Sequence, residues 1–197
     1  MPTVNMRIAF FVIFLLLVPS AVQAQVLSVA QVQKMLRNAR AEAPSYRDVP
    51  ATLTYSPAFT SLWQQSDQVA RHARSLLLNP IMNADDEAIL VLALQNARWK
   101  ELFGLYEWAF DCYTNGQLSA ETVAALIFPS SDWNTRLEFR YKDPAVRKFL
   151  VRIQHSKLPQ EQGWLSKYLL NILSGKAADE IRVAQNEGQL LDRNRKD

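Results

Sequence analysis

The stretch that decides the fold is NADDEAILVLAL, residues 83–94. Asn83 is a favourable N-cap because its side chain can accept a hydrogen bond from the first turn of a helix. The acids at positions 85–87 are stabilised at the positive end of the helix dipole. Residues 88–94 are apolar on every side of a helix, and this pattern predicts a central helix enclosed by others. The sequence therefore predicts a fold built from packed helices.

Helix signals recur along the chain. Ser28 and Gln31 have the spacing of a capping box, and Ser56-Pro57 supplies an N-cap followed by proline at the first helical position. An apolar period of 3.6 residues then predicts one long helix that runs to Leu77. Further helices are expected over 97–113, 119–128, 144–156, 160–174 and 176–187. The predicted fold class is all-α, as a single irregular bundle of seven to eight helices.

A short HEAT-like array of helical pairs is the alternative. Asp143-Pro144-Ala145-Val146-Arg147 resembles the opening of a HEAT-type helix, and the expected helices follow one another in pairs. No second copy of the motif follows in register. The bundle is therefore the first prediction.

The segment over 130–142 breaks the helical pattern. Leu137, Phe139 and Tyr141 alternate with charged residues, which is the period of a strand. Because one strand cannot satisfy its own backbone hydrogen bonds, we expect an extended loop or a short strand that lies on the helices.

Two residues of the expected helix over 97–113 bear on its packing. Gly104 costs that helix about 1 kcal/mol relative to alanine, so we expect a neighbouring helix to approach closely there. Cys112 shares an apolar stripe with Leu105 and Trp108, which favours a buried, unreactive thiol. An intermolecular disulfide is the alternative.

Residues 1–24 have the organisation of a secretory signal peptide. Arg7 precedes an apolar run over 8–18, and small residues occupy the positions before a cleavage site that follows Ala24. The run is too short to cross a bilayer, which needs about 20 residues. We therefore expect a signal peptide over 1–24, a helical domain over 25–191 and a disordered polar tail over 192–197.

Charge and cysteine content narrow the compartment and the partners. The net charge is +3, and cleavage after Ala24 removes only Arg7, which leaves about +2. So small an excess gives no footprint for nucleic acid. Cys112 is the single cysteine, so no internal disulfide can form. Since small secreted eukaryotic domains usually carry disulfides, we expect a bacterial periplasmic or secreted protein that needs no membrane span after cleavage.

No motif for a cofactor or a metal ion is present, and neither is expected. The glycines form no phosphate-binding loop, and His72 and His155 have no partner at metal-ligand spacing. The arguable catalytic residues are Glu107 and Asp111, one helical turn apart, although they also fit a polar helix face. Residues 85–87 could bind a cation, and Arg71, His72 and Arg74 could bind an anion. Helix-start charges and a solvated face are the simpler interpretations of these two groups.

The segment over 130–142 is the predicted partner-binding surface. Tryptophan, tyrosine and arginine are the residues that most often anchor interfaces, and loops on rigid scaffolds carry much of recognition. The alternative is that the aromatic residues merely cover the core. The proposed contact residues are Trp133, Arg136, Phe139, Arg140 and Tyr141.

These features favour a binding protein over an enzyme. The leading hypothesis is a periplasmic protein-binding domain, most specifically an immunity protein that neutralises a toxin or effector from a neighbouring cell. One alternative is a periplasmic enzyme that acts on peptidoglycan through acidic residues. The other is an accessory factor of envelope assembly or secretion.

Overall fold

The computed structural model describes residues 26–43, 53, 55–129, 135–180 and 182–183, and within them the fold is all-α with no strand. The predicted signal peptide and polar tail lie outside the described residues. The labelled helices are α2 (Val29–Glu42), α3 (Pro57–Gln64), α4 (Ser66–Leu77), α5 (Ala84–Leu94), α6 (Trp99–Thr114), α7 (Ala120–Ile127), α8 (Thr135–Phe139), α9 (Pro144–Gln154), α10 (Leu158–Glu161) and α11 (Leu165–Ser174). Residues 176–180 and 182–183 are helical as well.

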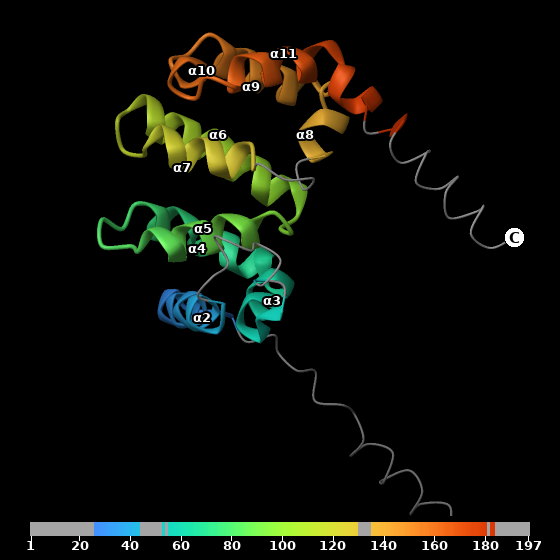
Figure 1. Ribbon diagram of the computed structural model, residues 1–197. Coiled ribbons are helices and arrows are strands. Elements are labelled where there is room, and N and C mark those ends of the chain that lie inside the picture. The colour runs from blue at the N-terminus through green and yellow to red at the C-terminus, as the bar shows by residue number, and fades with distance from the viewer. Residues whose placement is uncertain (1–25, 44–52, 54, 130–134, 181, 184–197) are drawn as a thin grey trace, which may run out of the picture.

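The helices are stacked in layers that follow chain order (Figure 1). The first layer holds α2 and α3, the second α4 and α5, the third α6 and α7, and the fourth α9 to α11, with α8 between the last two layers. In the described part of the chain, extensive packing joins each layer only to its neighbours in the stack. The arrangement is thus layered, which the first prediction of an irregular bundle does not describe.

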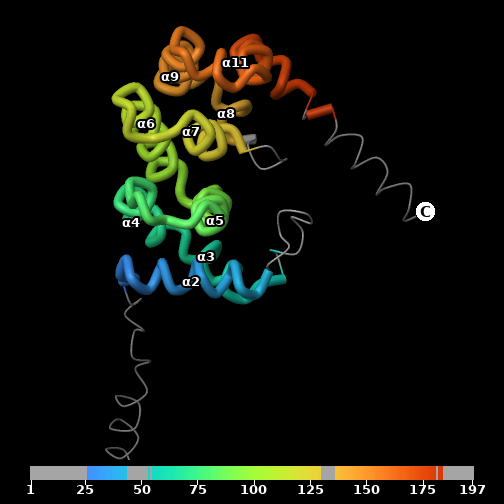
Figure 2. The backbone as a smooth tube through the Cα atoms, turned by 60° about the vertical axis from the view of Figure 1, so that its left-hand side comes forward, coloured from blue at the N-terminus to red at the C-terminus, as the bar shows by residue number. Residues whose placement is uncertain are grey.

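The second, third and fourth layers each contribute one helix to either side of the stack, while α2 lies across the base of both rows (Figure 2). Figure 2 shows α4, α6 and α9 in one row and α5, α7 and α11 in the other. Packing along the rows is direct, since α4 lies against α6 and α5 lies against α7. In the first row, Phe149 of α9 makes edge contacts with Phe103 and Phe110 of α6, at centroid distances of 5.5 and 5.9 Å. The candidate site lies on the α5–α7–α11 row.

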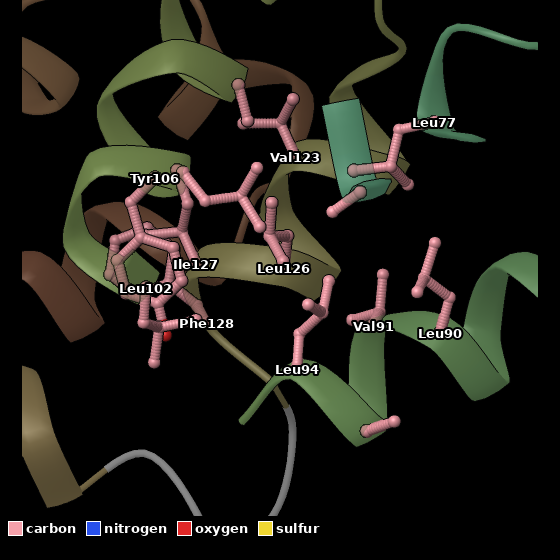
Figure 3. Close-up of a cluster of buried hydrophobic side chains, with 14 of the residues drawn as sticks. Leu77, Leu90, Val91, Leu94, Leu102, Tyr106, Val123, Leu126, Ile127 and Phe128 are labelled. Atoms are coloured by element: carbon pink, nitrogen blue, oxygen red, sulfur yellow. The ribbon is translucent and has the colours of Figure 1, made fainter. Parts of the chain in front are cut away.

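The apolar helix α5 is enclosed, as its sequence predicts. The side chains of Ile89, Leu90 and Leu94 have no exposed surface. Figure 3 shows Val91 and Leu94 pointing toward Leu126 of α7, and this cluster is part of one core that continues through the layers. Because α5 packs on α2, α3, α4 and α7, it needs apolar side chains on more than one face.

The long helix predicted from Pro57 to Leu77 is two helices. Gln65 leaves the helical conformation, with φ −102° and ψ 19°, and α4 restarts at Ser66. The break lets α3 pack mainly on α2 while α4 packs on α5 and α6. The apolar period continues across the break because both helices bury the same kind of stripe, so the period alone could not reveal it.

The extended loop or short strand predicted over 130–142 is wrong for residues 135–142, and residues 130–134 lie outside the described part of the chain. Residues 135–139 form the short helix α8, and 140–142 form a turn, in which the Arg140 amide donates to the Leu137 carbonyl at 3.1 Å. Leu137 and Glu138 are both buried. Adjacent residues of a strand point to opposite faces, so a strand lying on the helices would have exposed one of them.

The two expectations for α6 have opposite outcomes. Cys112 is buried, as predicted, and burial raises the pKa of its thiol. The close approach expected at Gly104 is wrong, because a Cβ atom added there would meet no atom within 4 Å. Within the described residues no helix combines the length and the apolar character that a membrane crossing requires.

Candidate functional site

An open groove lies on the α5–α7–α11 row. It has a volume of about 360 Å³, and its surface is mostly apolar. It spans α5, α7 and the junction of α10 with α11, so it crosses three layers of the stack. The groove is lined by Ala88, Val91, Leu92, Glu121, Ala124, Ala125, Phe128, Pro129, Gln162 and Trp164.

Small side chains leave the space, and large rings close one edge of it. Ala88 on α5, with Ala124 and Ala125 on α7, places methyl groups where longer side chains would fill the groove. Phe128 is buried, whereas Trp164 is 49% exposed. The two rings meet edge to face at a centroid distance of 6.5 Å. The edge is therefore a fixed aromatic surface that solvent can reach.

A third ring supports that edge from behind. Tyr168 lies 5.9 Å from Phe128 and 5.8 Å from Trp164, centroid to centroid. Its hydroxyl donates a hydrogen bond to the carboxylate of Glu138. Aromatic pairs of this kind add about 0.5–1.5 kcal/mol each beyond the area they bury. The aromatic edge is thus held in place by α8.

Glu138 is a buried acid with one oxygen in use. Its side chain accepts from Tyr168 through Oε1, while Oε2 is buried and accepts no hydrogen bond from the described residues. Burial raises the pKa of Glu138 above its usual value. Glu138 does not line the groove, so its connection to the site runs through Tyr168.

The polar groups of the groove are acidic or neutral. Glu121 and Gln162 are its polar lining residues, and it has no lysine or arginine. Hydrogen bonds from its own backbone amide and from the Ser119 hydroxyl lower the pKa of Glu121, so its carboxylate is ionised at neutral pH. Beside it, Thr122 of α7 donates to Glu87 of α5 at 2.5 Å. The rim of the groove therefore carries negative charge.

The arginines predicted to bind a partner make contacts within the chain. Arg136 donates from Nη1 to the Ala97 carbonyl at 2.5 Å. The Arg140 guanidinium lies over the Trp99 ring, 4.7 Å from its centroid. Both contacts connect α8 and the turn after it to the start of α6.

The predicted aromatic residues have mixed environments. Tyr141 is half-buried and packs on the core, with its hydroxyl 2.7 Å from where a Cβ atom at Gly175 would lie. Phe139 is 39% exposed. Trp133 lies outside the described residues. The structure does not gather these residues into the groove, and their binding of a partner stays a prediction.

Of the two acids proposed for catalysis, Asp111 is engaged by an arginine. Asp111 forms an ion pair with Arg152 at 2.7 Å, and both side chains are largely exposed. Glu107 is half-buried on the same helix. Asp111 is therefore an ordinary surface ion-pair partner, of a kind that contributes at most about 1 kcal/mol to stability.

The groups proposed for ions also have local partners. Asp86 pairs with Arg40 at 3.5 Å, and no cluster of three or more metal-binding side chains occurs in the part of the chain that the structure describes. The Nε2 atom of His72 lies 2.6 Å from the Leu27 carbonyl oxygen. Arg74 reaches the Gly104 carbonyl at 3.5 Å, while Arg71 is exposed.

The groove is the feature that the sequence did not reveal. In the sequence, the groove corresponds only to three alanines on two helices. Small residues at such positions are equally typical of helices that pack closely together. Only the spacing of α5, α7 and α11 distinguishes an open groove from a filled contact. Comparisons with protein-family models, with curated proteins and with solved structures found no match to this chain.

Proposed function

We propose that this chain is an exported protein-binding domain, most specifically an immunity protein that neutralises a toxin or effector from a neighbouring cell. The observation that carries the proposal is the open apolar groove on the α5–α7–α11 row, with Trp164 half-exposed at its edge. Apolar grooves between helices are a recurrent way of holding an inserted segment of a partner. Trp is among the residues that contribute most to binding when a partner covers it.

The groove is a better binding surface than the segment first predicted. Arg136 and Arg140 each make a contact within the chain, so a partner would have to compete for them. Trp164 and Ala125 are accessible and line a concave surface. We therefore place the partner in the groove, while Phe139, exposed on α8, could extend the contact.

The layered fold suits this role. In a stack of helical pairs, each layer contacts only its neighbours, and a row of helices presents a continuous surface for a partner. Such surfaces bind without mobile parts, because the helices are already held by the core. The predicted export over residues 1–24 would place this surface where a delivered toxin arrives.

A competition experiment tests the immunity role. A strain that lacks the gene should be outcompeted on solid medium by sister cells that retain it, while growing normally alone. The full chain should restore survival, and the chain carrying Ala125→Gln with Trp164→Ala should not. Leu170→Ala is the matched control, because Leu170 is exposed on α11 but does not line the groove.

Two other outcomes would replace this role. A growth or envelope defect of the deletion strain without competitors would favour the accessory-factor alternative. Release of muropeptides from purified peptidoglycan, lost in Glu107→Gln, would favour the cell-wall enzyme. Equal protection by the groove variant and the Leu170→Ala control would remove the groove from the proposal.

A further inference from the structure

We propose that the groove binds a protein segment that is both apolar and positively charged, so that the partner inserts apolar side chains beside a lysine or an arginine. This inference rests on the proposed function and names the chemistry of the partner. It follows from the carboxylates at the rim of the groove, which form no ion pair with a lysine or an arginine among the described residues.

The apolar lining of the groove favours apolar side chains of a partner. Val91, Leu92 and Ala124 meet Phe128 and Trp164 in a surface that is mostly apolar. Covering such a surface removes apolar area from water at about 25 cal/mol per Å². The volume of about 360 Å³ admits a few side chains rather than a folded domain, so a segment that projects from the partner is the fitting occupant.

Three carboxylates belong to the groove or adjoin its lining residues in sequence. Glu121 lines it, Glu87 precedes the lining residue Ala88, and Glu161 precedes the lining residue Gln162. They come from α5, α7 and α10, so the negative charge is contributed by three separate helices. Glu87 and Glu121 are linked across the α5–α7 contact by Thr122, which donates to Glu87 and follows Glu121 in sequence, whereas the Glu161 carboxylate accepts from Tyr113 of α6.

None of these acids is paired with a cation among the described residues. Their carboxylates instead accept hydrogen bonds from neutral hydroxyls: Thr122 donates to Glu87 at 2.5 Å, and Tyr113 donates to Glu161 at 2.7 Å. The Ser119 hydroxyl donates to the Glu121 carboxylate in the same way. Neutral donors orient a carboxylate without cancelling its charge, so the charge remains available to a ligand.

Some acids elsewhere in the chain are paired with cations. Asp67, Asp86 and Asp111 each form an ion pair with an arginine, at 2.8, 3.5 and 2.7 Å. Glu42 and Asp143 also accept hydrogen bonds from neutral donors, so the distinguishing feature of the groove is that its lining contains an acid and no lysine or arginine. Complementary charge across an interface steers association and rejects partners of the wrong sign, and here it calls for a cationic segment.

Selection from random peptides tests the inference without knowledge of the partner. The purified full chain is panned against displayed random dodecapeptides, and clones are kept only if they fail to bind the chain carrying Ala125→Gln with Trp164→Ala. We expect the retained peptides to combine aromatic or aliphatic residues with lysine or arginine. Synthetic copies should bind Glu121→Lys more weakly than the unmodified chain, by up to about fivefold, which is the largest effect expected from one exposed charge pair.

The charge control is Glu101→Lys, at an exposed acid. It makes the same change of charge on α6, which belongs to the opposite row of helices, and it should leave peptide binding unchanged (Figure 2). Retained peptides that lack an excess of basic residues, or that bind Glu121→Lys as well as the unmodified chain, overturn the cationic partner and leave the groove as a binding site. If no peptide depends on Ala125 and Trp164, the groove itself is rejected, and the proposed binding site falls with it.

Discussion

The hydroxyl of Tyr168 on α11 donates a hydrogen bond to the carboxylate of Glu138 on α8. The contact joins the short helix between the third and fourth layers to the last helix of the stack. It also supports the aromatic edge of the groove, since the Tyr168 ring packs on Phe128 and Trp164.

Glu138 should make the protein less stable as the pH rises. Burial raises the pKa of Glu138 in the folded state above its value of 4.5 in the unfolded chain, so the folded state binds more protons. Its contribution to stability is therefore full below pH 4.5 and is lost as the pH rises through the folded pKa. Urea unfolding across this range should show a free energy of unfolding that falls more steeply for the unmodified chain than for Glu138→Gln.

Two observations check that result. Tyr168→Phe removes the hydroxyl that donates to Glu138 and should lower the free energy of unfolding by about 1–3 kcal/mol, since it leaves a buried acceptor without this partner. Identical pH dependence in the unmodified chain and in Glu138→Gln would show that the carboxyl does not titrate over this range.

Gly104→Ala should stabilise the protein by about 1 kcal/mol. Gly104 lies inside α6, and an added Cβ atom would meet no atom within 4 Å. The substitution therefore removes backbone freedom from the unfolded chain without a clash in the folded one. Thermal or urea unfolding measures the gain, and a loss of stability would mean that a neighbour does approach Gly104.

Gly175→Ala should destabilise the protein more than Gly116→Ala. Both glycines have positive φ, of 83° and 71°, where alanine costs about 1–2 kcal/mol. Only at Gly175 would the new Cβ atom also clash, 2.7 Å from the hydroxyl oxygen of Tyr141. Comparison of the two free energies of unfolding isolates the clash. The excess should shrink when Gly175→Ala is combined with Tyr141→Ala.

Arg140→Ala should lower the free energy of unfolding by about 0.5–1 kcal/mol, because the guanidinium lies over the Trp99 ring. A double-mutant cycle with Trp99→Leu should recover a coupling of that size. Zero coupling would mean that Arg140 does not stabilise the fold through this contact. Arg140 would then be available to a partner, as the sequence-based hypothesis assumed.

The sequence by itself determined the starts and ends of most helices. Ser28 and Gln31 form the predicted capping box, and Asn83 caps α5 through the Asp85 amide at 2.8 Å. Asp143 caps α9 in the same way, and Gly175 ends α11 in the left-handed conformation. These features were predictable because each involves residues within a turn or two of one another, where local geometry decides the outcome.

The tertiary structure decided everything that depends on residues far apart in the chain. The break at Gln65 serves the separate packing of α3 and α4, and α8 is helical because it buries Leu137 and Glu138 together. At both places the local sequence pattern predicted a different secondary structure, because the pattern alone was incomplete. A stripe of apolar residues records that a segment is buried, and it does not record which neighbours bury it.

The groove also depends on residues that lie far apart in the chain. Its residues lie on three elements whose spacing is set by the stacking of the layers, and the Glu138–Tyr168 contact behind it spans 30 positions in sequence. Alanine at positions 88, 124 and 125 is compatible with close packing or with an open surface. The sequence therefore determined that helices form and where they stop, whereas packing between layers decided where the chain leaves an open groove.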